Sequence, residues 1–273
     1  MERVTMEEID EVTVIPAGRS AKVSSRDSEG VFIEGREVSL TSFQMARSPV
    51  TQKLFEAVMG YNPGSRSSSS QQTETLFQPV DKVSWYEAVV FCNRLSILMG
   101  LKPCYHISGT TTPDSWGEIP ATTNNLWNSI DWDTEANGFR LPTEAEWEFA
   151  ARGADPQSGI WKYPYAGSDI IDEVAWFKDN SNSGINQVGL KKPTASGLYD
   201  MSGNVYEWCW DWFGPVGLGA ETNPTGPSTG TNRVRRGGSW LNYARSCKVT
   251  YRNCDSPDTV YSNIGFRLAR SSV

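Results

Sequence analysis

The sequence predicts one loop-rich α+β domain with short antiparallel strands and two to three helices. A length of 273 residues lies within the range that β-rich or irregular domains reach as one unit. The 24 Gly and 15 Pro indicate extensive loops, whereas eleven Trp supply bulk for a core. Because we find no internal repeat and no separating linker, we expect a single domain over residues 30–273, with a lead-in over 1–29 packed on it.

Short strands are expected near the N-terminus and again after about residue 160. Residues 11–45 alternate apolar and polar side chains, and turn residues interrupt the alternation. This period of two is typical of half-buried strands joined by tight turns. The pattern therefore predicts short antiparallel strands in this region.

Three segments carry helix signals. The first has a Thr51 cap, an apolar stripe with helical spacing, and an end near Gly60. The second covers residues 84–99, and the third begins at Thr143. In both of these, a Glu three positions after the Ser or Thr cap completes a capping box.

The charge balance argues against two classes of partner. A net charge of −7 and a pI near 4.9 oppose binding to nucleic acid or anionic lipid. The alternating arginines Arg233, Arg235 and Arg236 are expected to form structural ion pairs at a strand edge. No stretch approaches the length of a membrane span, and residues 1–18 lack a signal-peptide core. We expect a soluble monomer, either cytoplasmic or derived from a precursor whose signal was removed.

Five long motifs resemble the formylglycine-generating enzyme, or sulfatase-modifying factor, family. They are PVDKVSWYEAVVFCNRLS at 79–96, GFRLPTEAEWEFAARG at 138–153, GLYDMSGNVYEWCWDW at 197–212, RVRRGGSW at 233–240 and IGFRLAR at 264–270. The resemblance implies a C-type-lectin-like fold with little regular secondary structure. The motifs also have a purely structural interpretation, because capped helix starts and large aromatic side chains help to determine a fold.

The family's oxidase chemistry depends on two copper-binding cysteines after the GGS motif. By this resemblance the second cysteine is Cys247, whereas Asn242 occupies the first position. An amide is a poor ligand for copper(I), which prefers sulfur. The sequence therefore predicts a protein without oxidase activity. The alternative is a copper-dependent formylglycine-generating oxidase with a rearranged site, in which Cys254 replaces the first cysteine.

Other metal chemistry is limited by composition. His106 is the single histidine, so it provides no basis for the multi-histidine iron sites of some relatives. The resemblance implies that the DMSGNVYE stretch could hold a structural calcium ion through Asp200, Gly203, Val205 and Glu207. Oxygen ligands on a bent loop suit calcium. The alternative is that Asp200 caps a turn and Glu207 pairs with an arginine. No other cofactor is expected.

Residues 239–263 have an unusual composition. Sixteen of these twenty-five residues are Asn, Asp, Ser, Thr, Tyr or Cys, and Glu, Gln, Met and Phe are absent. Such a polar, Tyr-rich loop on a rigid frame is typical of antibody paratopes. It also resembles the variable region of proteins diversified by retroelements. The alternative is an ordinary polar surface loop.

The resemblance to these variable proteins divides the segment into fixed and ligand-facing positions. The fixed positions that this chain keeps are Ala244, Cys247, Val249, Arg252 and Pro257. Trp240 either packs into the frame or forms the floor of the site. The implied ligand-facing positions are Leu241, Tyr243, Arg245, Ser246, Thr250, Tyr251, Asn253, Cys254, Asp255, Ser256, Thr259, Tyr261, Ser262 and Asn263.

These observations predict a non-catalytic, receptor-type binding protein. Numerous polar positions indicate a broad face, which fits a protein or cell-surface ligand better than a small metabolite. By resemblance to the family, the protein would act at the bacterial cell surface.

Overall fold

The computed structural model describes residues 12–15, 21–22, 29–64 and 75–271. The α-helices are α1 (Gln52–Met59), α2 (Trp85–Leu98), α3 (Asn125–Asn128), α4 (Glu144–Ala151) and α5 (Ile171–Val174). The 3₁₀ helices are η2 (Thr75–Phe77), η3 (Pro113–Ser115), η4 (Gly159–Lys162) and η5 (Ala244–Cys247). The strands are β1 (Val12–Ile15), β2 (Ala21–Lys22), β3 (Arg36–Ser39), β4 (Phe43–Ala46), β5 (Tyr105–His106), β6 (Asp131–Trp132), β7 (Ala175–Trp176), β8 (Ser202–Gly203), β9 (Tyr206–Trp212), β10 (Gly219–Thr222), β11 (Arg233–Arg236), β12 (Asn253–Asp255), β13 (Ile264–Phe266) and β14 (Ala269–Ser271).

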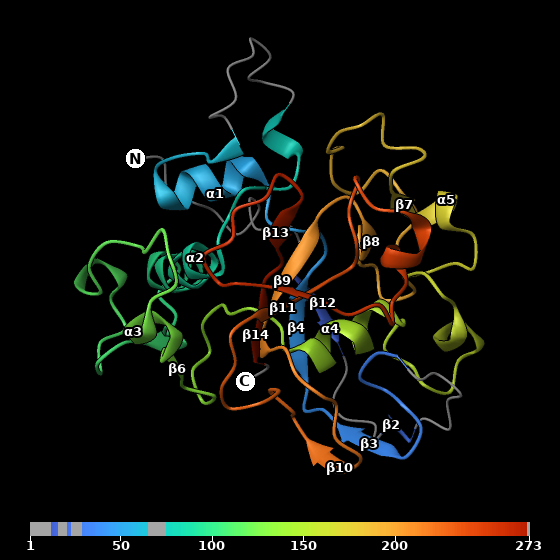
Figure 1. The fold of residues 1–273 in the computed structure, drawn as a ribbon, viewed down its shortest axis with the longest axis horizontal. Helices are drawn as coiled ribbons and strands as arrows, with labels where there is room; N and C mark the ends of the chain where they lie inside the picture. The colour runs from blue at the N-terminus through green and yellow to red at the C-terminus, as the bar shows by residue number, and fades with distance from the viewer. Residues whose placement is uncertain (1–11, 16–20, 23–28, 65–74, 272–273) are drawn as a thin grey trace.

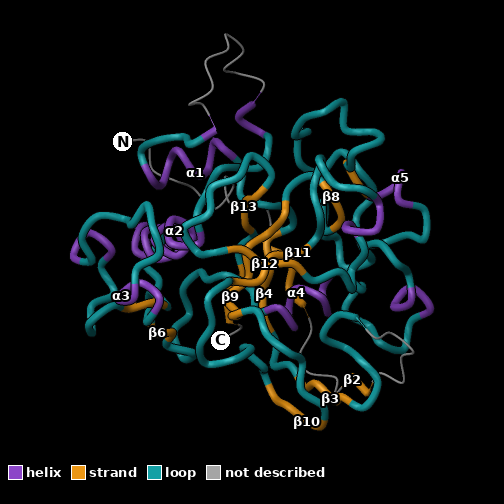
Figure 2. Tube along the Cα trace, in the orientation of Figure 1, coloured by secondary structure: helices purple, strands orange, loops and turns teal. Residues whose placement is uncertain are grey.

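A four-stranded sheet with the order β12-β11-β9-β13 lies at the centre of the molecule (Figure 1). Strand β9 pairs antiparallel with β11 and parallel with β13. Because successive side chains of a strand point to opposite faces, Trp208 enters the core that contains α1 and α2, while Cys209 enters the core that contains α4. The central sheet therefore separates two hydrophobic cores, and most of the surrounding chain is loop (Figure 2).

The N-terminal strands join small peripheral sheets. Strand β4 pairs antiparallel with β1 and β14, and β2 pairs antiparallel with β3, which confirms the predicted short antiparallel strands. Strand β10 adds to β3 in parallel. Most of the predicted 1–29 lead-in lies outside the described residues, and the proposed domain boundaries stay a prediction.

The three predicted helices are confirmed with their caps. Thr51 caps α1, which ends at Gly60 in the left-handed conformation. Ser84 and Thr143 cap α2 and α4, and both helices have the complete capping box. The additional helices α3 and α5 are single turns of four residues. No helix among the described residues is long and apolar enough to cross a membrane.

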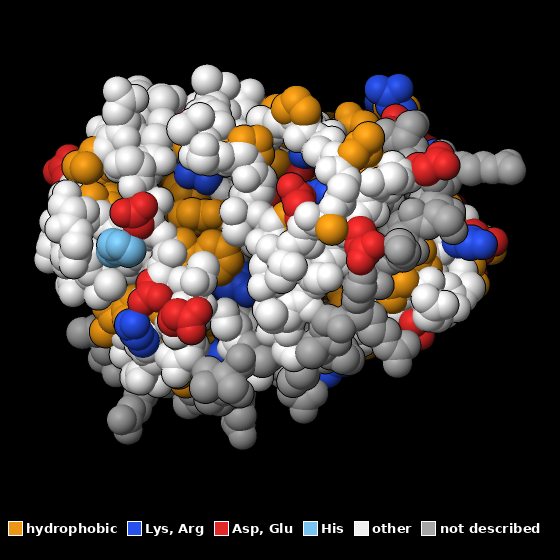
Figure 3. All heavy atoms as spheres, turned by 90° about the horizontal axis from the view of Figure 1, so that it is seen from below, with side chains coloured by type: hydrophobic (Ala, Val, Ile, Leu, Met, Phe, Trp, Pro, Cys, Tyr) orange, Lys and Arg blue, Asp and Glu red, His pale blue; other side chains and the backbone are white. Residues whose placement is uncertain are grey.

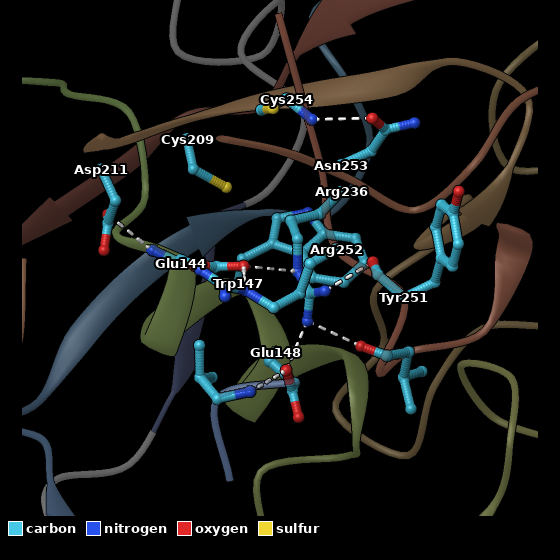
Figure 4. Close-up of polar contacts among 12 residues, drawn as sticks. Glu144, Trp147, Glu148, Cys209, Asp211, Arg236, Tyr251, Arg252, Asn253 and Cys254 are labelled. Carbon is cyan, nitrogen blue, oxygen red and sulfur yellow. Dashed lines mark hydrogen bonds and ion pairs between the residues drawn. The ribbon is translucent and has the colours of Figure 1, made fainter. Parts of the chain in front are cut away.

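Helix α4 carries a buried charge network that joins both halves of the chain. The carboxylate of Glu148, which is 0% exposed, accepts hydrogen bonds from Arg236, Arg152 and the backbone N–H of Val31. One turn earlier, Glu144 accepts two hydrogen bonds of 2.7 Å from Arg252. Figure 4 shows Glu148 and Glu144 of α4 beside Arg236 and Arg252. The predicted structural ion pairs of the arginine cluster are confirmed for Arg236 and also for Arg235, which pairs with Asp255. The prediction was wrong for Arg233, which forms no ion pair among the described residues, and for the strand edge, because β11 lies between β12 and β9.

We expect Glu148→Gln to lower the free energy of unfolding by about 3–5 kcal/mol, because it leaves buried guanidinium groups without their carboxylate. Denaturant unfolding with an unchanged m-value measures this loss. The control is Glu173→Gln, which removes an exposed pair with Lys192 and should cost far less. A loss for Glu148→Gln no larger than that of the control would contradict the structural role of the network.

Candidate functional site

The Tyr- and Asn-rich segment 239–263 begins at a double-glycine turn. Gly237 and Gly238 both have positive φ, at 94° and 73°. A Cβ on Gly238 would lie 2.7 Å from both the Cys247 sulfur and the Ser246 carbonyl oxygen. Only glycine therefore allows the chain to turn so closely over η5, which explains the GGS motif locally.

Several of the fixed positions attach this segment to the rest of the domain. Cys247 is 0% and Val249 1% exposed, and Pro257 is also buried. Arg236 donates hydrogen bonds to the carbonyl oxygens of Val249 and Tyr251. The Trp85 N–H, at the start of α2, donates to the Pro257 carbonyl at 2.9 Å. The segment is thus attached at several points between its two ends.

Most of the predicted ligand-facing side chains reach solvent. Leu241, Tyr243 and Tyr261 are 52%, 61% and 54% exposed. Arg245 and Ser262 are exposed as well. The remaining solvent-reaching positions are half-buried, and they are Trp240, Thr250, Tyr251, Asn253, Cys254, Asp255, Ser256 and Thr259. We call the exposed and half-buried positions of this set the variable face.

Two predicted ligand-facing residues are buried in the structure. Ser246 and Asn263 are each 8% exposed. The Asn263 side chain donates a hydrogen bond of 3.0 Å to the Ser239 hydroxyl, and the Ser246 N–H donates to the Tyr243 carbonyl. We therefore do not include either residue in the variable face.

Trp240 bridges the two ends of the segment. Its indole N–H donates a hydrogen bond of 3.1 Å to the carbonyl of Ser262, and the side chain stays half-buried. Both alternatives for Trp240 therefore hold in part, because it packs on the frame and still presents surface between the ends.

Residues distant in sequence extend this surface. Lys178 donates to the Tyr243 hydroxyl at 2.8 Å and lies 4.1 Å from the centre of its ring. Thr123 donates to Asp258 at 3.0 Å and lies 3.0 Å from the Ser256 hydroxyl. No local sequence pattern marked Lys178 or Thr123, because both reach the site only through the tertiary fold.

The two cysteines of the oxidase alternative lie in different surroundings. Cys247 packs with Val174, Ala175 and Phe177, and burial raises the pKa of its thiol to about 12. Cys254 lies on β12, where its sulfur accepts a hydrogen bond from Asn232, and burial raises its pKa as well. Asn242 receives a hydrogen bond from the Ser239 hydroxyl. Neutral thiols are weak nucleophiles and weak metal ligands.

The predicted calcium ligands are engaged by protein groups. The Glu207 carboxylate accepts hydrogen bonds of 2.8 and 3.0 Å from Arg267 and one of 2.7 Å from Trp147. Asp200 accepts from the Gly189 N–H and from Asn204. A cation here would compete with the Arg267 guanidinium for the same oxygens. With these two carboxylates engaged, the donor set Asp200, Gly203, Val205 and Glu207 does not fit calcium as arranged, so we expect no calcium ion there, and a calcium titration tests this expectation.

Comparison with known proteins places this architecture in one family. The model of the sulfatase-modifying factor enzyme 1-like domain matches residues 1–272. The chain belongs to this family. Its mixed, loop-rich fold is the C-type-lectin-like fold of the formylglycine-generating enzyme type.

Individual relatives include both enzymes and a variable protein. The solved structure of Treponema denticola variable protein 1 is 37% identical and superposes with a TM-score of 0.84, covering 96% of this chain and 95% of that chain. A protein named chaperone protein LppX from Paenibacillus barcinonensis is 33% identical over 86% of this chain and 82% of its own length. The formylglycine-generating enzyme of Streptomyces coelicolor is 35% identical over 54% of this chain and 51% of its own length. The similarity thus spans only about half the length of that enzyme.

We expect neither calcium nor EDTA to change the melting temperature, because Arg267 already neutralises Glu207. A ligand that binds only the folded state raises the melting temperature with its concentration. Differential scanning calorimetry at increasing calcium concentrations makes this comparison, with magnesium as the control. A rise specific to calcium, lost in Asp200→Asn, would instead support the calcium site.

Proposed function

We propose that the protein is a non-catalytic, receptor-type binding protein whose variable face contacts a protein or cell-surface ligand. The observation that carries this proposal is the division of segment 239–263. Its buried positions are held by the α4 charge network, while tyrosines and small polar side chains reach solvent. Tyr offers a large contact area at low entropic cost, and small polar residues adapt their hydrogen bonds.

Similarity to the treponemal variable protein supports this proposal over most of the chain. By that similarity, residues 239–263 would be diversified in the coding DNA, and the protein would act at the bacterial cell surface. The face combines the exposed side chains of Leu241, Tyr243 and Tyr261. Such an arrangement suits a broad macromolecular contact better than a small metabolite.

The alternative, a formylglycine-generating oxidase, has its support at the level of the family. Against it stands Asn242, which occupies the position of the first sulfur ligand. A copper(I) site prefers soft sulfur ligands, and an amide oxygen is a poor substitute. We propose that this chain performs no thiol oxidation.

A display library tests the binding function without knowledge of the natural ligand. In this library, a mixture of codons for Tyr, Ser, Asn and Asp replaces the codons of Leu241, Tyr243, Arg245, Thr250 and Tyr261. Variants that bind a chosen protein, such as lysozyme, are then selected. We expect folded clones with affinities of about 10⁻⁷ M or tighter, as for natural paratopes. The control library carries the same codons at five exposed positions outside the segment, namely Leu126, Ile170, Leu190, Leu218 and Phe77.

A library that folds but gives binders no more often than the control would contradict the assignment of this face. Analytical size exclusion and thermal unfolding of random clones verify that folding is retained. We expect the loss of melting temperature per substitution to be small, since the randomised side chains are exposed or half-buried.

Incubation with a cysteine-containing sulfatase peptide, copper(I) and oxygen tests the oxidase alternative. We expect mass spectrometry to find no aldehyde product, and we expect Cys247→Ser and Cys254→Ser to bind as much copper as the unaltered protein. Aldehyde formation, or copper affinity that both substitutions abolish, would establish the oxidase instead.

A further inference from the structure

The structure contains a cavity whose lining residues are distinct from those of the variable face. The cavity has a volume of about 620 Å³ and is bounded by α3, β6, the end of β9 and the loop 225–230. Trp132, Trp210 and Trp212 contribute its aromatic lining. Figure 3 shows a hollow with a hydrophobic floor close to the single histidine, which lies on β5 beside β6. No residue of segment 239–263 lines the cavity.

The cavity wall contains a buried cation that pairs with no carboxylate among the described residues. Arg233 is 2% exposed and lies between indole rings, 3.5 Å from the centre of Trp212 and 3.8 Å from that of Trp85. Its single hydrogen bond runs from Nη1 to the Trp210 carbonyl, and its Nε has no partner. Among the residues that the structure describes, the other buried arginines each form an ion pair, and they are Arg36, Arg140, Arg152, Arg236 and Arg267.

The surroundings of Arg233 leave its charge incompletely balanced. Asp211 is the carboxyl group that acts on it most strongly, but the two side chains form no ion pair. Asp211 instead accepts a hydrogen bond from the Glu144 N–H, and burial raises its pKa, which disfavours its charged form. Leaving a buried cation unpaired is costly for stability. A ligand that carries a negative charge would remove this cost.

The other residues that line the cavity show which chemical groups surround the charge of Arg233. The Trp132 indole N–H is a second buried donor without a partner. The rim is rich in amide and hydroxyl groups, which come from Asn125, Asn128, Ser129, Thr134, Thr225, Ser228 and Thr229. Aromatic faces pack against flat apolar surfaces, and amides and hydroxyls exchange hydrogen bonds with ligand hydroxyls. One exposed carboxylate, Asp131, also lines the cavity, which disfavours a ligand of high negative charge.

We propose that this cavity binds an acidic sugar, a pyranose that carries one carboxylate. The carboxylate receives hydrogen bonds from Arg233, the C–H face of the ring packs on the tryptophans, and the ring hydroxyls meet the polar rim. Charge-assisted bonds of this kind are about twice as strong as neutral ones. The site is independent of the proposed function, because none of its residues belongs to the variable face.

Isothermal titration calorimetry of the unaltered protein tests the proposal with two matched disaccharides. Cellobiouronic acid carries one carboxylate, and cellobiose has the same ring system without it. We expect the acid to bind at least about tenfold more tightly, because only the acid pairs with Arg233. Equal affinity for the two sugars, or no binding of either at millimolar concentration, would overturn the proposal. Tighter binding of indole-3-acetate than of the sugar acid would overturn the assignment to a sugar.

Two substitutions locate the binding. Arg233→Gln removes the charge and Trp132→Ala removes part of the aromatic lining, so each should weaken binding of cellobiouronic acid about tenfold or more. Phe77→Ala, at an exposed aromatic residue outside the cavity, is the control and should bind as the unaltered protein does. Circular dichroism verifies folding. If Arg233→Gln does not fold, the test rests on the affinities of the unaltered protein for the two disaccharides and on the affinity of Trp132→Ala for the acid. A folded Trp132→Ala variant with unchanged affinity would contradict binding in this cavity.

Discussion

The ion pairs between helix α4 and three arginines hold the architecture together. Glu148 and Glu144 are buried, and they reach Arg152 in their own helix, Arg236 on the central sheet and Arg252 in the C-terminal segment. A buried carboxylate is stable only when cations and N–H groups satisfy it, so these contacts require one arrangement of helix, sheet and segment. These contacts therefore fix the position of the variable face relative to helix α4 and the central sheet.

This support explains how a loop-rich segment can present many different side chains. The contacts that fix its path use backbone carbonyls, such as those of Val249 and Tyr251, together with the buried Cys247 and Pro257. Exposed side chains such as Tyr243 and Tyr261 take little part in that support. Chemistry at the surface can therefore change while the path of the backbone is retained, which is the requirement for a binding face that varies.

Local signals in the sequence predicted the three longer helices, because Thr51, Ser84 and Thr143 act through bonds to neighbouring residues. Motif resemblance predicted the fold, and composition predicted which segment reaches solvent. The burial of Ser246 and Asn263 was not predicted, because residue type does not show which side of an irregular segment a side chain takes. Lys178 was not predicted, and the expected ion pair of Arg233 was wrong, for a related reason: the surroundings of both residues exist only after distant segments pack.

A binding face on a rigid frame can be tested by replacing every position in 239–263 with all other residues. Resistance to proteolysis then reports which variants fold. We predict that Leu241, Tyr243, Arg245 and Tyr261 accept nearly all residues, whereas Cys247, Val249, Arg252 and Pro257 accept few. Equal intolerance at the exposed tyrosines and at the buried positions would show that the segment is packed throughout, and it would contradict a binding face built on a rigid frame.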